Sequence, residues 1–220
     1  MQEVHIIKKK KKMKCKYHNT KFTPKYFNQK FCLSDDECIK AFNEFVKAEK
    51  EKQRVKQWQK EKKVIKESLK TKSSYKDDLQ YEINQIIKYI DKNVNCISSG
   101  RQLRESRNSG HIYAVGGNDT LRFNLDNIYN QSISDNKDKG GKPLEALEGI
   151  KEMYGIEQYN LVLGLKSRYK YLGLSIEDLK EKIKIARQIV KELQKADLTY
   201  SANVRLELRK KYNERLGIYV

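Results

Sequence analysis

The 220-residue sequence contains no apolar run that approaches the roughly 18 residues of a membrane-spanning helix. Its opening stretch, MQEVHIIKKKKKMK, holds a basic run with no apolar segment after it, so we expect no secretory signal. Without export, the four cysteines are expected to be metal ligands or free thiols and not disulfides. Internal repeats are also absent. These absences argue against a membrane protein and against a disulfide-rich secreted domain.

Hydrophobic residues are scarce, at 38%, while charged residues reach 35%, which is typical of long, exposed helices. The net charge is +18, and between Lys8 and Lys72 there are 22 Lys or Arg against 8 Asp or Glu. Such a block favours a nucleic-acid partner, because neutralised phosphates release condensed counterions. A membrane surface is the competing partner and is disfavoured. For Lys8 to Lys14, a solvated tail that only confers solubility is the alternative.

The distribution of residues predicts a mainly α protein with a small α+β element. No Gly or Pro occurs from Asp35 to Leu69, where Lys, Glu and Gln dominate, so this range is expected to form one long, basic helix. The segments are expected to be a basic tail (1–13), a zinc-knuckle-like segment (14–38), the long basic helix (39–72), a central domain with a β hairpin (73–172) and a C-terminal helical segment (173–220).

Further helices are expected after the break at Thr71 to Tyr75. A helix should end near Val94, two short helices should fill 144–172, and a last helix should run from about Ser201 to Leu216. Ser175 and Asp178 form the pattern of a capping box before a strong helix. The apolar positions of that helix follow a heptad, which would pack either on the chain's own helices or against a second subunit as a homodimer. They are Ile176, Leu179, Ile183, Ala186, Val190 and Leu193.

Cysteines and a histidine in the first 38 residues form a candidate zinc site. Cys15 and His18 are followed, after a loop, by Cys32 and Cys38, a layout typical of a small zinc knuckle. A segment this short buries too little apolar surface to fold alone, so metal binding would supply the folding free energy. A small aromatic cluster with free thiols is the alternative. The aromatic residues expected to cap the site are Phe22, Tyr26, Phe27 and Phe31.

The Gly- and Asn-rich centre predicts a short hairpin. His111 begins the β-like run HIYAV, a Gly-Gly turn follows, and LRFNL is expected to be a second strand that ends near Asn127. Asn136 and Lys139 follow near the start of a short helix. A histidine on one strand, an asparagine at the hairpin end and an Asn-x-x-Lys pattern match the layout of an HNH, or ββα-metal, nuclease.

The chain resembles the phage NinG/Rap recombination proteins from about Lys14 to Leu193. The segments that carry the resemblance are KCKYHNTKFTPKYFNQKFC, YIDKNVNCISSGR, GHIYAVGGNDTLRFNLDNIYNQ and DNKDKGGK. The resemblance implies a structure-specific endonuclease that acts on branched DNA such as Holliday junctions. It also implies a phage-encoded protein in the cytoplasm of an infected bacterial host, with packaging in the virion as an alternative.

The sequence departs from the family pattern around the hairpin. The family's two CxxC pairs, which hold a structural zinc, read Cys96–Ser99 and Ser132–Asp135 here. We therefore predict no zinc at this second site, because one thiolate, two hydroxyls and a carboxylate are a poor zinc ligand set. The family's acidic residue ahead of the Gly-His pair is Asn108.

By this resemblance His111 would be the general base that deprotonates water, and Asn127 would hold His111 or the hairpin loop. Asn108 and Asn136 would help to hold a magnesium or manganese ion, weakly, since amide oxygens carry no charge. For His111, a purely structural role is the alternative. The expected DNA contacts are Lys8, Lys9, Lys10, Lys11, Lys12, Lys14, Lys16, Lys21, Lys25, Arg122 and Lys139.

Three functions remain open from the sequence. The first is an active metal-dependent endonuclease for branched DNA, which the retained His111 favours. The second is a DNA-binding relative that has lost catalysis, and the third is a structural or interaction protein. Asn108 and the missing cysteines favour the second and third.

Overall fold

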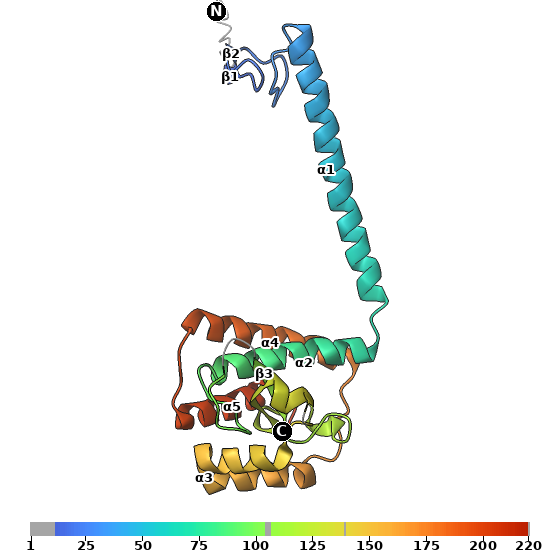
Figure 1. Cartoon of the computed structure of the whole chain (residues 1–220). Helices are drawn as coiled ribbons and strands as arrows, with labels where there is room; N and C mark the ends of the chain where they lie inside the picture. Colours follow the sequence, from blue (N-terminus) through green and yellow to red (C-terminus); the bar gives the residue numbers. More distant parts are fainter. Residues whose placement is uncertain (1–11, 104–106, 139, 220) are drawn as a thin grey trace, which may run out of the picture. The chain divides into compact units, whose positions relative to one another are not determined.

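The computed structural model describes residues 12–103, 107–138 and 140–219 (Figure 1). The chain forms two compact units, residues 1–69 and residues 70–220. Helices predominate, with two small antiparallel sheets, which confirms the mainly α composition that the sequence predicts. Among the described helices, none has the length and apolarity needed to cross a membrane.

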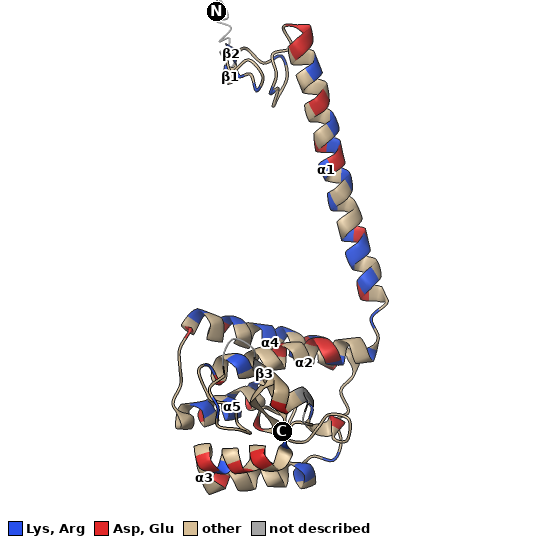
Figure 2. Cartoon of the chain, in the orientation of Figure 1, with Lys and Arg blue, Asp and Glu red and all other residues tan. Residues whose placement is uncertain are grey.

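The first unit consists of a short hairpin, an irregular loop and one long helix. Strands β1 (Met13–Lys14) and β2 (Lys21–Phe22) pair, and α1 spans Asp36–Ser68. Asp35 caps α1, since its side chain accepts a hydrogen bond from the Cys38 backbone N–H. Every residue from 50 to 69 is exposed, and Figure 2 shows the positions of Lys and Arg, coloured blue, along this part of α1.

The aromatic residues of the first unit divide into an inner and an outer set. Phe31 is buried and packs against Phe42 and Phe45 of α1, with ring centroids 5.7 and 5.4 Å away. Tyr26 and Phe27 lie at the surface instead, so the expectation that they cap the metal site is wrong. The apolar start of α1 supplies the cover that these two rings were expected to provide.

In the second unit, α2 (Lys72–Ile90) packs along α4 (Ile176–Ala196), and α5 (Ala202–Leu216) packs against both. Ser175 and Asp178 form the expected capping box of α4. The buried apolar residues of α4 face the Ile-rich side of α2. The heptad seam is therefore covered by the chain's own helices. This is the first of the two predicted alternatives, the second being contact with another subunit.

Helix α3 (Pro143–Arg168) packs against the central hairpin through a second apolar cluster, separate from the one between α2 and α4. It contains a kink at Gly155, whose backbone φ of 87° lies in the left-handed region that favours glycine. The two short helices expected here are thus joined end to end. Ile150 and Val162 of α3 pack on Ile97, Leu121 and Tyr129.

The central hairpin pairs β3 (Arg107–His111) with β4 (Ile128–Ser132), with His111 opposite Ile128. The strands expected at HIYAV and LRFNL are wrong. Only His111 of the first stretch belongs to a strand, as the last residue of β3, and the rest of both stretches lies in the long connection between β3 and β4. That connection contains two short 3-10 helices, η1 (Asp119–Leu121) and η2 (Leu125–Asn127). Asn127 therefore precedes the second strand and does not end it. A π-helical turn, η3 (Ser134–Asp138), follows β4.

Candidate functional site

The four predicted zinc ligands converge in the first unit. The β1–β2 turn carries Cys15 and His18, the following loop carries Cys32, and the first turn of α1 carries Cys38. The Sγ atoms of Cys15 and Cys32 each lie 3.7 Å from the Sγ atom of Cys38. Nδ1 of His18 lies 3.1 Å from Sγ of Cys32 and 3.8 Å from Sγ of Cys15.

These separations match a tetrahedral zinc site. Zn–S bonds of about 2.3 Å at tetrahedral angles place two sulfur atoms roughly 3.8 Å apart. All four ligand atoms lie within 4.8 Å of one another. Burial opposes ionisation of the Cys15 thiol, but N–H groups directed at its sulfur, from His18, Cys32 and Tyr17, lower its pKa to about 6. The residues present fit one structural zinc.

Asp35 supports this cluster in a way that the sequence analysis missed. Its Oδ2 lies 2.9 Å from Nε2 of His18, and its Oδ1 accepts the Cys38 N–H at 2.8 Å. A carboxylate on the outer nitrogen fixes the orientation of a metal-binding imidazole. The same side chain fixes the helix start that presents Cys38. The signal in the sequence was Asp35, a residue type that favours the N-cap, three positions before the predicted metal ligand Cys38.

His111 ends β3, and its imidazole is held by the opposite connection. Nε2 of His111 lies 2.9 Å from the carbonyl oxygen of Arg122. A carbonyl only accepts hydrogen bonds, so Nε2 carries the proton and Nδ1 carries the free lone pair. Burial lowers the pKa of His111 below its ordinary value, which favours the neutral ring. A neutral imidazole with a fixed tautomer can accept a proton at Nδ1.

Asn127 is fully buried and ties the connection between the strands together. Its Oδ1 accepts the Tyr113 N–H at 2.8 Å, and its Nδ2 donates to the carbonyls of Tyr113 and Leu121, both at 3.2 Å. These bonds close the loop that follows His111. Asn127 was expected to hold either His111 or the hairpin loop, and these hydrogen bonds correspond to the second role.

Amide oxygens gather beside Gly110 on the hairpin. A Cβ atom placed on Gly110 would lie 1.7 Å from Oε1 of Gln131 and 3.0 Å from Oδ1 of Asn136. The buried Oε1 of Gln131 has no hydrogen-bond partner among the described residues. Asn108 pairs with Gln131 across the sheet, so the two side chains share one face. An unpaired buried oxygen beside a second amide oxygen fits a hard divalent cation.

At the second family zinc site, the structure places a polar network. Asp135 is fully buried, and its Oδ2 accepts hydrogen bonds from Ser132 Oγ at 2.8 Å and Cys96 Sγ at 3.4 Å. The Lys142 ammonium lies 3.5 Å from the other carboxylate oxygen. Burial would raise the pKa of Asp135, but these hydrogen bonds and the Lys142 charge hold it well below its ordinary value. The carboxylate thus links the segment of Cys96 to the segment of Ser132.

The predicted DNA contacts have different surroundings. Arg122 is engaged by carboxylates, with its Nη2 atom 2.6 Å from Asp77 and its Nη1 atom 3.8 Å from Asp119, so a phosphate would have to displace them. Described lysines of the first unit are exposed, and they are Lys12, Lys14, Lys16, Lys21 and Lys25. The remaining predicted contacts lie outside the described residues, and they are Lys8, Lys9, Lys10, Lys11 and Lys139.

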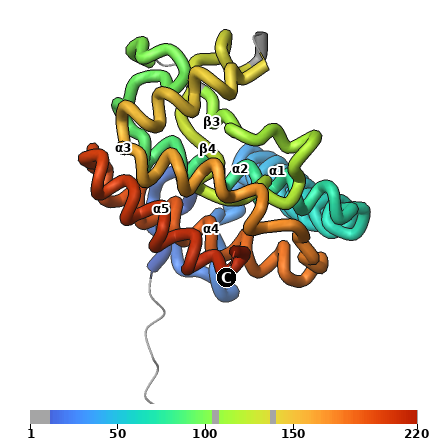
Figure 3. Tube along the Cα trace, turned by 90° about the horizontal axis from the view of Figure 1, so that it is seen from below, coloured from blue at the N-terminus to red at the C-terminus, as the bar shows by residue number. Residues whose placement is uncertain are grey.

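Helix α5 packs against α3, α4 and η2, the short helix that precedes β4 (Figure 3). Arg209 is fully buried, donates to the Ile128 carbonyl at 2.7 Å and lies over the Tyr129 ring at 4.2 Å. Asn213 accepts the Leu125 N–H at 3.0 Å. No role for this segment could be expected from its sequence, since its polar residues resemble those of any exposed helix.

The Tyr219 hydroxyl extends this bracing to the histidine. It donates to the Thr120 carbonyl at 2.9 Å and accepts the Phe123 N–H at 3.1 Å. These two positions flank Arg122, whose carbonyl holds His111. The C-terminal segment therefore fixes the backbone that sets the tautomer of His111.

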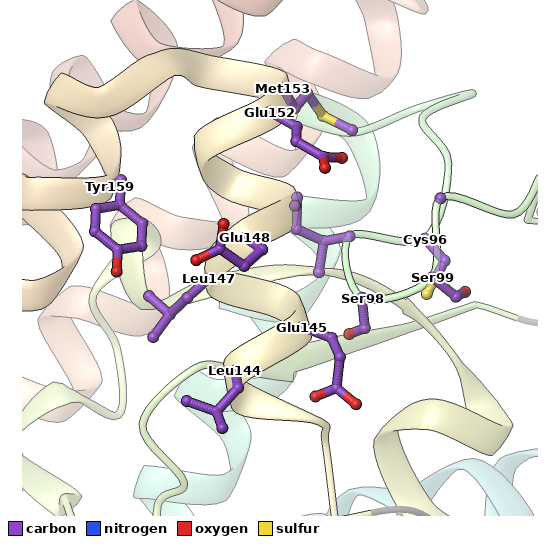
Figure 4. Close-up of a pocket in the computed structure, with 13 residues that line it drawn as sticks. Cys96, Ser98, Ser99, Leu144, Glu145, Leu147, Glu148, Glu152, Met153 and Tyr159 are labelled. Atoms are coloured by element: carbon purple, nitrogen blue, oxygen red, sulfur yellow. The ribbon is translucent and has the colours of Figure 1, made fainter.

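A cavity of about 840 Å³ lies between the 96–100 loop and α3. Figure 4 shows Glu145, Glu148 and Glu152 on the α3 wall, across from the loop that carries Cys96. His111 and Asn127 do not line it. Three carboxylates repel phosphate, so we expect nucleic acid to approach the hairpin from another face.

The family model described as bacteriophage lambda NinG protein matches residues 7–197. No curated protein and no solved structure gives a significant match. Helix α5 lies beyond the matched residues.

Proposed function

Because the chain belongs to the bacteriophage lambda NinG family, we propose that it is a metal-dependent endonuclease for branched DNA in phage recombination. The observation that carries this proposal is His111, whose Nε2 is bonded to the Arg122 carbonyl and whose Nδ1 is left as a base. We place its action in the cytoplasm of an infected bacterial host. A homodimer would suit the two-fold symmetry of a Holliday junction.

In the proposed reaction, Nδ1 of His111 takes a proton from water as the water oxygen attacks phosphorus. The new P–O bond forms as the bond to the leaving oxygen breaks, and the leaving oxygen takes a proton from solvent. The Arg122 carbonyl keeps the imidazolium oriented. Asn127 keeps the loop after His111 closed, which holds the base near the phosphate.

Asn136 and Gln131, with Asn108 beside them, would hold a magnesium or manganese ion. When bound, such an ion supplies charge neutralisation for the phosphate and the leaving oxygen. All three side chains are neutral amides, so substrate phosphates are needed to complete the binding. We therefore expect metal affinity to rise when DNA is present.

The first unit would supply most of the DNA affinity. Residues 50–66 contain eight Lys or Arg and two Glu, all on an exposed helix. Trp58 on this helix is 58% exposed, and the Lys62 ammonium lies 4.9 Å from its ring centroid. Basic groups spaced along a helix bind phosphates without sequence preference. One zinc held by Cys15, His18, Cys32 and Cys38 would order the end of this arm.

A catalytically inactive DNA-binding relative is the second candidate. The observation that favours it is the absence of a carboxylate among the three amides beside Gly110. A structural or interaction protein that reuses the scaffold is the third. Both alternatives retain the basic first unit and differ from the nuclease only at the hairpin.

Cleavage of a labelled four-way junction in magnesium or manganese separates these candidates. We expect wild-type protein to cut the junction, while His111→Ala binds it with unchanged affinity and cuts at least about 100-fold more slowly. Equal activity of the two proteins, or none in either, would remove the nuclease proposal. Binding without cleavage would then support the second candidate, and no binding would support the third.

A further inference from the structure

The loop between β2 and Cys32 presents an aromatic ring to solvent. Phe27 is 92% exposed, and the adjacent Tyr26 is 51% exposed. Phe27 is the most exposed of the large apolar side chains among the described residues, and Tyr26 extends the exposed aromatic surface beside it.

The turn that displays Phe27 is braced from within. Gln29 is only 3% exposed, and its Oε1 accepts the Lys25 N–H at 2.7 Å while its Nε2 donates to the Phe31 carbonyl at 2.8 Å. Asn28 adopts a left-handed φ of 60°. Phe31 is anchored in the core of the unit. One buried amide thus clamps both ends of the turn, which keeps Phe27 pointing outward.

The surroundings of Phe27 are entirely basic or neutral in sequence. From Val4 to Ser34 the chain contains no Asp or Glu. Lys21, Lys25 and Lys30, which flank the turn in the sequence, are exposed. Exposed aromatic rings between cations match a polyanion that offers a flat apolar face, which is what an unpaired base in nucleic acid provides. A membrane would be better matched by a broad apolar face than by one turn with two exposed rings.

We infer that Phe27 stacks on an unpaired base at a DNA branch point, with Lys21, Lys25 and Lys30 contacting the phosphates beside it. The inference rests on the proposed DNA-binding function and adds the feature of DNA that the first unit recognises. Phosphate contacts alone bind duplex and branched DNA similarly. The ring adds affinity only where a base is free to stack.

The test compares full-length wild type with Phe27→Ala in fluorescence anisotropy. The probes are a four-way junction with unpaired bases at its centre and a linear duplex with the same number of phosphates. We expect Phe27→Ala to weaken junction binding about tenfold and leave duplex binding unchanged. Phe27→Tyr, which keeps the ring, should bind both probes like wild type. Because Phe27 is exposed, the zinc content of each variant should be unchanged.

A direct signature comes from 2-aminopurine placed at the junction centre. Stacking should quench its fluorescence with wild type and with Phe27→Tyr, and quenching should be lost with Phe27→Ala. Wild-type binding that does not depend on Phe27, or equal weakening on both probes, would overturn this inference and leave the proposed nuclease intact. So would Phe27-dependent binding to anionic phosphatidylserine vesicles with unchanged DNA binding. Failure of wild type to bind either DNA would overturn both proposals.

Discussion

Arg209 and Asp91 form an ion pair inside the second unit, with Nη2 of the arginine 2.7 Å from Oδ2 of the aspartate. Both side chains are buried, and they lie 118 positions apart in the sequence. The pair joins α5 to the end of α2, while the same guanidinium also bonds the Leu125 and Ile128 carbonyls under the hairpin.

Replacing Arg209 by Met should destabilise the second unit by about 3–5 kcal/mol, because it leaves the Asp91 charge buried without its partner. Thermal unfolding followed by circular dichroism measures this change. Arg215→Met is the matched control, since its pair with Glu192 is partly exposed and should contribute little. Equal losses in the two variants would contradict the importance of the buried pair.

Tyr219→Phe should slow junction cleavage about tenfold while the fold is kept, since the ring still packs on Tyr169, 5.0 Å away between centroids. The lost hydroxyl frees the backbone on both sides of Arg122. The Nε2-protonated tautomer of His111, visible by ¹⁵N NMR in wild type, should become less populated. Tyr171→Phe, at an exposed ring, is the control. If Tyr219→Phe cleaves more slowly but leaves the His111 spectrum unchanged, Tyr219 does not act by positioning His111 through the Arg122 carbonyl.

Elemental analysis should find about one zinc per chain, lost in Cys32→Ser and retained in Cys96→Ser. Removal of the metal should unfold the first unit, because its small aromatic cluster cannot hold the loop without it. The unfolding of the second unit should not change. Two zinc ions per chain would show that the hairpin site binds metal despite its lost cysteines.

In the pH profile of cleavage, the decline in rate on the acid side should have its midpoint below pH 6.5, because the ordinary pKa of histidine is about 6.5. Burial lowers the pKa of His111, so the base stays neutral, and active, to a lower pH. The amide metal ligands do not titrate, so this decline reports the histidine. By the same linkage, the contribution of His111 to the stability of the fold is present above the pKa that it has in the unfolded chain. That contribution is lost as the pH falls toward the pKa of His111 in the folded chain. A midpoint above pH 6.5 would contradict the buried imidazole.

Gly110→Ala should disturb the hairpin, since the new methyl group would meet Oε1 of Gln131 at 1.7 Å. We expect a loss of about 1–3 kcal/mol in unfolding free energy. The double variant Gly110→Ala with Gln131→Ala should recover part of this loss, because the clash is removed. Gly116→Ala, which meets nothing within 4 Å, is the control. No recovery in the double variant would assign the loss to the backbone instead.

Much of the helical fold could be predicted from the sequence, because helices are indicated by the spacing of apolar residues and by capping residues at their ends. The long helix from Asp35 and the Ser175 capping box are local features, and both are present. The four cysteine and histidine ligands could be predicted for the same reason. Their convergence follows from a short loop between two ligand pairs.

The hairpin strands could not be placed, because their signal is weak in this chain. Strand β4 reads IYNQS, and its Asn130 and Gln131 are buried polar residues that bond to Asp91 and Ser98. Alternation of apolar and polar residues, on which strand prediction depends, is lost when buried amides replace apolar side chains. LRFNL and the part of HIYAV after His111 have the apolar pattern, but they lie in the connection between the strands, which the hydrogen bonds of Asn127 hold closed.

The bracing of the hairpin by α5 has a consequence for the timing of folding. Every group that Arg209, Asn213 and Tyr219 hold precedes them in the chain, and translation delivers them last. A nascent chain can form its Cys/His segment and its long helix before the ribosome has made α5. The histidine would be secured only afterwards. Under the proposed function, nascent chains would therefore bind DNA before they could cut it.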